Sequence, residues 1–185
     1  MKQLLAIAVL GLSLFGADLY ACQAPEKIKF SSVYTGLGKD CQKIKEGMEV
    51  ITVCPGVGGY RIQIFSSSMV QMIMAETPDK KDAISLAMQS LDFDYTKLRI
   101  EWRLANGKPF AIILQAEIYG DPAEDTPLIG RKIGEELRIT GLKGLYQIDS
   151  VVSSITSSAH SIARQLADNG YRNRNKDIFP SAWSC

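Results

Sequence analysis

The amino-acid sequence predicts an α+β domain in which a mainly antiparallel sheet of about six to seven strands, connected by hairpins, packs one face against a C-terminal helix. Two observations favour this fold class. Short segments in which apolar and polar residues alternate follow one another between turns rich in glycine, proline and serine, as half-buried strands do. Near the C-terminus, residues 155–167 instead repeat apolar side chains at helical spacing.

The first part of the sheet is expected to be a three-stranded meander over residues 49–53 (EVITV), 60–65 (YRIQIF) and 69–75 (MVQMIMA). The glycines of the intervening PGVGG predict a turn or bulge with positive φ angles. Thr77 followed by Pro78 is typical of a helix cap and a first helical residue. Apolar residues after this pair recur at helical spacing and predict a short helix; they are Ala83, Ile84, Ala87, Met88 and Leu91.

A long hairpin is predicted next. Residues 97–104 (KLRIEWRL) alternate cleanly, and residues 109–119 (PFAIILQAEIY) form a long apolar run suited to a buried strand. Asn106-Gly107 between them is a strong signal for a tight turn. One face of the first strand carries Leu98, Ile100 and Trp102.

Two further strands and the helix complete the expected domain. Residues 135–140 (EELRIT) and 145–152 (LYQIDSVV) are strand-like. The helix is expected over 157–169 and is expected to end at the glycine that follows Asn169. From about residue 171 the chain becomes a polar tail. One helix face holds Ile155, Ala159, Ile162, Ala163, Leu166 and Ala167.

Composition excludes several classes of protein. The chain has 185 residues, of which 46% are hydrophobic and 22% charged, values that exclude a disordered chain and fit one globular domain. Twenty-one Lys and Arg residues against 20 Asp and Glu residues leave a net charge of +1. Near-neutral charge argues against a nucleic-acid partner, because such proteins need a basic face to displace counterions.

The N-terminus predicts export. Lys2 precedes an uncharged apolar run, Leu4–Gly16, of about 13 residues, which is shorter than the roughly 17–25 needed to span a bilayer. We therefore expect residues 1–21 to be a signal peptide and residues 22–185 to be a single domain in the periplasm or secreted, without a transmembrane span. Cleavage after Ala21 would make Cys22 the first mature residue, so a lipid-anchored envelope protein is the alternative.

Four cysteines remain after cleavage, and an even count in an exported chain predicts disulfides. We favour Cys41 with Cys54, because they are close in sequence and flank a turn-prone segment, residues 42–48. Cys22 and Cys185 would then join the two ends, although the sequence leaves the connectivity open. The cysteine spacing lacks the close pairs of a zinc site, and we expect no metal or cofactor.

Several short motifs are spread over most of the chain after residue 32. They are VYT at 33–35, Cys41, CPGVGGY at 54–60, EWR at 101–103, GKPFA at 107–111, ARQLAD at 163–168 and Cys185. In these motifs the chain resembles a group of small exported proteobacterial proteins of unknown function, and this resemblance implies a Gram-negative envelope address and no catalytic residues. That group often has a cysteine where this chain has Leu145 or Tyr146, so here Cys185 needs another partner, and Cys22 is available.

Strand alternation indicates one candidate binding face. Glu101 and Arg103 should point away from the face that carries Trp102, as a charged pair opposite a core aromatic residue. A ligand or partner face on this strand, with Tyr60 as a further member, is the binding hypothesis.

His160 is the only histidine, so any imidazole chemistry must use it. Ser157 lies one helical turn before it, but a hydrolase also needs an acid behind the ring, and no nucleophile-elbow motif is present. We expect a non-catalytic envelope protein that binds a partner protein or small ligand, with a lipoprotein anchored through Cys22 or a hydrolase using His160 as alternatives.

Overall fold

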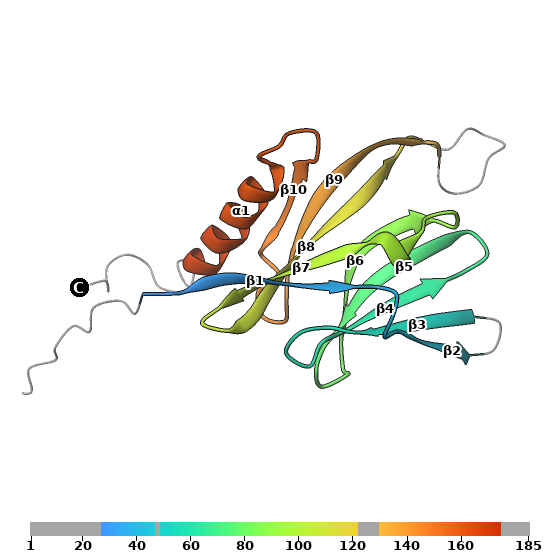
Figure 1. Ribbon diagram of the computed structural model, residues 1–185, viewed down its shortest axis with the longest axis horizontal. Helices are drawn as coiled ribbons and strands as arrows, with labels where there is room; N and C mark the ends of the chain where they lie inside the picture. Colours follow the sequence, from blue (N-terminus) through green and yellow to red (C-terminus); the bar gives the residue numbers. More distant parts are fainter. Residues whose placement is uncertain (1–26, 47–48, 122–129, 175–185) are drawn as a thin grey trace, which may run out of the picture.

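The structure, a computed structural model, describes residues 27–46, 49–121 and 130–174. Within these residues, ten strands form two five-stranded antiparallel sheets, and one α-helix packs on one of them (Figure 1). The predicted α+β class with a helix on one sheet face is confirmed, but the strand count exceeds the predicted six to seven.

Some expected features lie outside the described residues. They are the signal peptide at 1–21, the lipid anchor at Cys22 and the disulfide between Cys22 and Cys185. In the described part of the chain, no helix has the length and apolar character needed to cross a membrane.

The first sheet consists of β1 (Phe30–Gly36), β7 (Arg99–Ala105), β8 (Lys108–Tyr119), β9 (Lys132–Gly141) and β10 (Asp149–Ser153), in the order β1-β7-β8-β9-β10. β7 and β8 form the predicted hairpin. Its turn residues, Asn106 and Gly107, have φ angles of 49° and 81°, which confirms the tight turn.

The second sheet is a meander in which each strand pairs with the next along the chain. It consists of β2 (Gln42–Glu46), β3 (Glu49–Pro55), β4 (Arg61–Ser66), β5 (Val70–Glu76) and β6 (Ala83–Ser90). The predicted glycine turn joins β3 to β4, with φ angles of 65° at Gly58 and 85° at Gly59.

The short helix predicted after Pro78 is wrong, because these residues form β6. Ile73 of β5 faces Ala87 of β6. The next residue of β5 faces Ser85, so Leu86 is an extra residue in a β-bulge. As a result, the consecutive residues Leu86 and Ala87 are both buried. The apolar residues of β6 therefore do not alternate regularly with polar ones, and their spacing resembles that of a helix.

Two strands, β1 and β2, were not predicted, and both lie at a sheet edge. Their sequences, FSSVYTG and QKIKE, lack the apolar alternation of strands buried on one face. Lysines on edge strands discourage pairing with other chains. They also make the sequence of β2 mostly polar, so that it resembles a solvated turn. The turn-prone segment expected at 42–48 is therefore a strand over its first five residues.

The helix is α1 (Ala159–Asn173), which continues four residues past its predicted end at Asn169 and into the expected polar tail. The glycine expected to end the helix, Gly170, lies inside it. A Cβ atom at this position would come 2.9 Å from Cγ1 of Ile148. Glycine is therefore present because the helix approaches Ile148 closely there.

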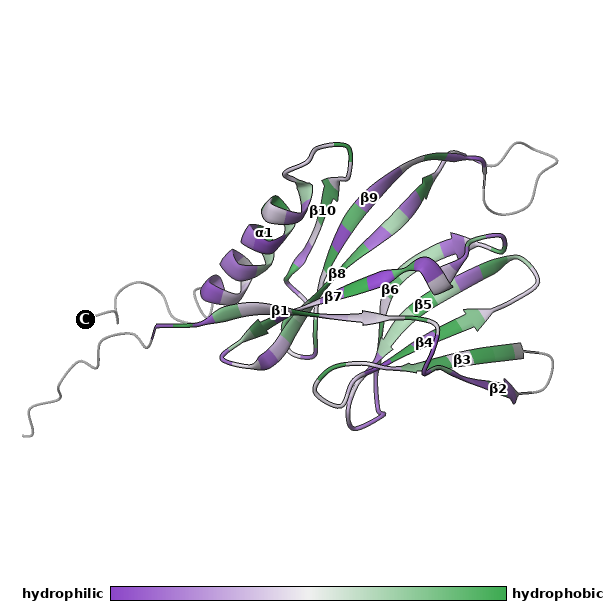
Figure 2. Cartoon of the chain, in the orientation of Figure 1, coloured by the Kyte–Doolittle hydropathy of each residue, from purple (hydrophilic) through white to green (hydrophobic). Residues whose placement is uncertain are grey.

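The molecule has three layers: α1, the first sheet and the second sheet (Figure 1). The first sheet is the middle layer, so β7 after its first residue and residues 110–114 of β8 are buried on both faces. Figure 2 shows hydrophobic residues along both sheets and a largely hydrophilic α1. The core between the sheets contains Ile62, Ile64, Ile73, Ile100, Trp102, Ile112 and Leu114, and the core under α1 contains Phe110, Ile113, Leu137, Ile139 and Ile148.

Small side chains bring α1 close to the first sheet. Its buried residues are Ala159, Ala163 and Ala167, spaced four apart on one face. Alanine adds little bulk and has the highest helix propensity, so the helix backbone packs close to the β-strands. Side chains that flank this stripe consequently meet the sheet as well.

The predicted disulfide between Cys41 and Cys54 is confirmed, with Cα atoms 4.1 Å apart. It joins the residue before β2 to the end of β3, and Cys54 is fully buried in the core between the sheets.

Replacing both of these cysteines by alanine should lower the free energy of unfolding by about 3 kcal/mol, because an uncrosslinked loop of this length gains conformational entropy when the chain unfolds. Urea unfolding of the variant and of the oxidised wild type measures the difference. Equal unfolding midpoints would contradict the prediction.

Candidate functional site

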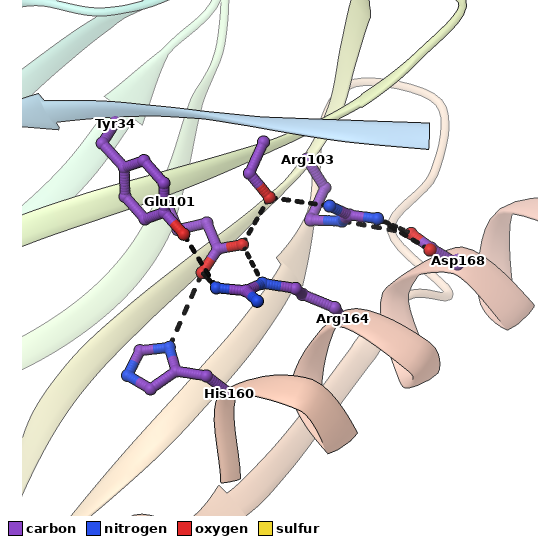
Figure 3. A network of polar contacts seen from close by, with 7 residues as sticks. Tyr34, Glu101, Arg103, His160, Arg164 and Asp168 are labelled. Atoms are coloured by element: carbon purple, nitrogen blue, oxygen red, sulfur yellow. Dashed lines mark hydrogen bonds and ion pairs between the residues drawn. The ribbon is translucent and has the colours of Figure 1, made fainter. Parts of the chain in front are cut away.

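Two ion pairs connect β7 to α1 (Figure 3). Arg103 donates through Nε and Nη2 to Asp168, at 2.7–3.1 Å, and Arg164 donates through Nε to Oε1 of Glu101 at 2.6 Å. We call these two pairs the ion-pair ladder. Its residues are two apart on the strand and four apart on the helix.

The spacing of the ladder follows from backbone geometry. Two strand residues advance about 7 Å along one sheet face, and four helix residues advance about 6 Å along one helix face. Because the two repeats nearly coincide, successive charged residues on β7 meet successive charged residues on α1. The ladder is thus a consequence of placing charges at i, i+2 on a strand and at i, i+4 on the adjacent helix.

The strand members of the ladder are buried. Glu101 is 2% exposed and Arg103 is 6% exposed. Charged groups are rarely buried to this extent unless they are paired, because the loss of hydration must be offset by partners. Each of these two side chains has such partners from more than one element.

Ser32 of β1 connects the two ion pairs of the ladder. Its hydroxyl accepts a hydrogen bond from Nη1 of Arg103 at 2.7 Å and donates one to Oε1 of Glu101 at 2.5 Å. Tyr34, two residues further along β1, accepts a hydrogen bond from Nη2 of Arg164 at 2.8 Å. The network therefore holds three elements, β1, β7 and α1, together.

Donors around Glu101 keep it ionised. Burial alone would raise the pKa of this carboxyl, but hydrogen bonds from Arg164 and Ser32, together with the positive charges of Arg164 and Arg103, outweigh burial and lower the pKa below its ordinary value of 4.5. Glu101 is therefore a fixed negative charge with its oxygens already occupied, unsuited to releasing a proton near neutral pH.

A hollow of about 460 Å³ opens beside the Glu101 end of the ladder. This size falls within the range of small-molecule sites. Its floor includes the buried Leu98 and Ile113. The other lining residues are all polar or charged: Tyr34, Lys97, Arg99, Glu101, Gln115, His160 and Arg164. We call it the basic hollow.

An adjoining hollow of about 450 Å³ has the opposite charge. It shares Lys97, Leu98 and Gln115 with the basic hollow, so the two hollows are neighbours. Its acidic lining residues are Asp92, Asp94, Glu117 and Glu135, and we call it the acidic hollow. Lys132 pairs with Glu117 and Glu135 at its border, and Lys97 pairs with Asp94.

The structure brings together two members of the predicted binding face and separates the third. Glu101 and Arg103 share the α1 side of β7, opposite Trp102, as expected, although they are buried and not exposed. Tyr60 lies on the other side of the sheet, where its ring packs against that of Trp102 at 6.1 Å, and burial raises the pKa of its hydroxyl.

His160 lies at the rim of the basic hollow, with Nδ1 3.6 Å from Oε2 of Glu101. The acid that a hydrolase would need is thus beside the ring, but it is also bound by Arg164. Among the described residues, no serine hydroxyl forms a hydrogen bond with His160. In the same residues, no cluster of three or more His, Cys, Asp or Glu is arranged to hold a metal ion.

Sequence reasoning missed Ser32, Tyr34, Arg164 and Asp168. For Arg164 and Asp168 a signal was present in the matched spacing of charges, two apart at 101 and 103 and four apart at 164 and 168. It becomes informative only when these two segments are known to lie side by side.

Replacing Asp168 by asparagine should lower the free energy of unfolding by about 3 kcal/mol, because it leaves a buried guanidinium without its counter-charge. The double variant Arg103→Met/Asp168→Leu removes both charges and should recover most of this loss. Urea unfolding at pH 7 provides the comparison. A loss below about 0.5 kcal/mol for Asp168→Asn, typical of a surface site, would contradict the burial argument.

Stability should also depend on the charge of Glu101. Its pKa in the folded protein is lower than in the unfolded chain, so its contribution is complete above the unfolded pKa and is lost as pH falls through the folded pKa. Wild-type stability should therefore fall more steeply below about pH 4.5 than that of Glu101→Gln. Thermal unfolding midpoints measured from pH 6 to pH 3 test this. The control variant Asp149→Asn, at an exposed position, should show the same dependence of the midpoint on pH as wild type. Parallel dependences for wild type and Glu101→Gln would contradict the prediction.

Comparison of the chain with models of protein families, with curated proteins and with solved structures gave no match in any of the three. We therefore infer the function from the geometry and charge of this chain, above all from the ion-pair ladder and the hollow beside it.

Proposed function

We propose that this protein is exported to the bacterial periplasm and acts there as a non-catalytic protein that binds a small ligand in the basic hollow. The hollow carries the proposal: about 460 Å³ of open space with an apolar floor and several side-chain donors on its walls. Binding sites for small molecules combine these properties. A rigid wall, formed by the buried ladder, keeps the donors in place before a ligand arrives, which lowers the entropic cost of binding.

The contacts of His160 support binding over catalysis. A general base has to be free to accept a proton from a nucleophile in reach. His160 is instead beside Glu101, whose two oxygens accept hydrogen bonds from Arg164 and Ser32. These residues are better suited to orienting a ligand than to activating one.

The disulfide supports the proposed compartment. Disulfides persist in oxidising environments such as the periplasm, and Cys41 and Cys54 form one. The apolar run at residues 4–16 and the resemblance to small exported proteobacterial proteins point in the same direction.

The intact mass of the exported protein tests the compartment and the fate of Cys22. A soluble periplasmic chain that begins at Cys22 should gain about four mass units on reduction, since each of two disulfides takes up two hydrogens. A mass increased by acyl chains, with a gain for one disulfide only, would show a lipid-anchored protein instead.

Filling the hollow tests the binding function. Gln115 is exposed and lines both hollows, so Gln115→Trp should block them, whereas Ser68→Trp places the same side chain at an exposed turn elsewhere. The low-molecular-mass fraction of a periplasmic extract should raise the thermal unfolding midpoint of wild type and Ser68→Trp, and leave Gln115→Trp unchanged. An unchanged wild-type midpoint, or an equal rise in all three proteins, would contradict binding in the hollow.

A further inference from the structure

We call each matched pair of positions on β7 and α1 a step of the ion-pair ladder. The step that would follow the Glu101–Arg164 pair has two bases and no acid. Two residues before Glu101 on β7 is Arg99, and four residues before Arg164 on α1 is His160. Both line the basic hollow. Where the first two steps each pair a base with an acid, the third step presents a guanidinium and an imidazole to open space. The hollow lies at the point where the pairing of charges stops.

Hydrogen-bond donors at this step are unused. Arg99 stacks over the ring of Tyr34, 4.2 Å from its centroid, and in the described part of the chain its guanidinium has no acidic partner. Arg164 uses Nε and Nη2 for Glu101 and Tyr34, which leaves its Nη1 without a partner among the described residues. A guanidinium has five N–H donors, so most of those of Arg99 and two of Arg164 remain available.

The charge of the hollow is positive after its internal pair is taken into account. Glu101 offsets one positive charge, that of Arg164. Arg99 then remains, together with Lys97 at the border, whose ammonium lies 3.1 Å from Asp94. A buried apolar floor of Leu98 and Ile113 excludes water from one side of the space, and electrostatic attraction is stronger where less water intervenes.

We propose that the basic hollow binds one anionic group, a carboxylate or a phosphate, of a small ligand, held between Arg99 and Arg164. The anion completes the third step of the ladder by supplying the acid that the chain lacks. Guanidinium groups bind both kinds of oxyanion through paired N–H donors. This inference rests on the proposed function and specifies the chemistry of its ligand.

The acidic hollow limits the ligand to a single anionic group. Asp92, Glu117 and Glu135 line the adjoining acidic hollow, and Lys132, which pairs with the two glutamates, offsets one of these three negative charges. A second anionic group there would meet like charges, which is unfavourable. The remainder of the ligand is therefore neutral or cationic, and polyanions are excluded.

Arginine side-chain NMR with acetate, inorganic phosphate and uncharged acetamide as probes tests the proposal at constant ionic strength. We expect saturable shifts of the Nε–H signals of Arg99 and Arg164 with acetate, with phosphate or with both, and the stronger of the two identifies the oxyanion class. Acetamide should cause no saturable shift. Absence of saturation with both anions, or equal saturation with acetamide, would overturn the proposal. Succinate that binds tenfold more tightly than acetate would overturn the limit to a single anion.

Variants locate the anion. Arg99→Gln should weaken binding of the better anion at least tenfold, whereas Arg131→Gln, which removes the same charge outside the hollow, should change it less than twofold. His160→Glu places a carboxylate at the third step and should abolish binding. An unchanged Nε–H signal of Arg103 shows that each variant keeps the ladder. Wild-type affinity in both Arg99→Gln and His160→Glu would overturn the assignment.

The two proposals fail separately. If the extract stabilises wild type but not Gln115→Trp, and neither anion binds, the hollow is a binding site for an uncharged or cationic ligand, and only the anion proposal is wrong. If the extract stabilises Gln115→Trp as much as wild type, the proposed function itself is wrong.

Discussion

The near-equality of two backbone repeats is the constraint on which the rest of the site depends. Four residues of an α-helix and two residues of a β-strand cover about the same distance, so a helix lying along a strand can match charge with charge over several steps. Ala159, Ala163 and Ala167 bring α1 close enough to the first sheet for this match to operate. The ladder then sets the position of α1 along β7, because a shift by one helical turn would place Arg164 opposite Arg103.

Burial makes the ladder specific for one position of α1 along β7. The first sheet is the middle layer of the molecule, and its charged side chains under α1 have little access to water. An unpaired charge at one of those positions would cost several kcal/mol, whereas replacing both members of a buried pair by well-packed apolar residues is often neutral or stabilising. The pairs therefore specify arrangement more than they add stability. The basic hollow lies beside the first turns of α1, which contribute His160 and Arg164 to its lining. Past this end of the helix, the first sheet continues without a helix over it (Figure 1).

Much of the fold could be predicted from local pattern, and the site could be predicted only in part. The hairpin around Asn106 and the glycine turn follow from signals within a few residues, and the disulfide joins cysteines only 13 residues apart. Strand alternation correctly placed Glu101 and Arg103 opposite Trp102. β6 was misread because its bulge disturbs the period, and the edge strands because solvent on several sides removes the apolar signal. The hydrogen-bond partners of Glu101, Ser32 and Arg164, lie more than sixty residues away in sequence, so no local pattern could identify them.

Native-state hydrogen exchange tests the central claim, that the ladder holds α1 on the first sheet. Amides of α1 and of β4 would be compared between wild type and Glu101→Gln at pH 7. We predict that exchange in α1 becomes at least tenfold faster in the variant, because losing the ion pair between Glu101 and Arg164 opens the helix locally. β4, in the other sheet, should keep its protection. Unchanged exchange in α1, or an equal acceleration in α1 and β4, would contradict it.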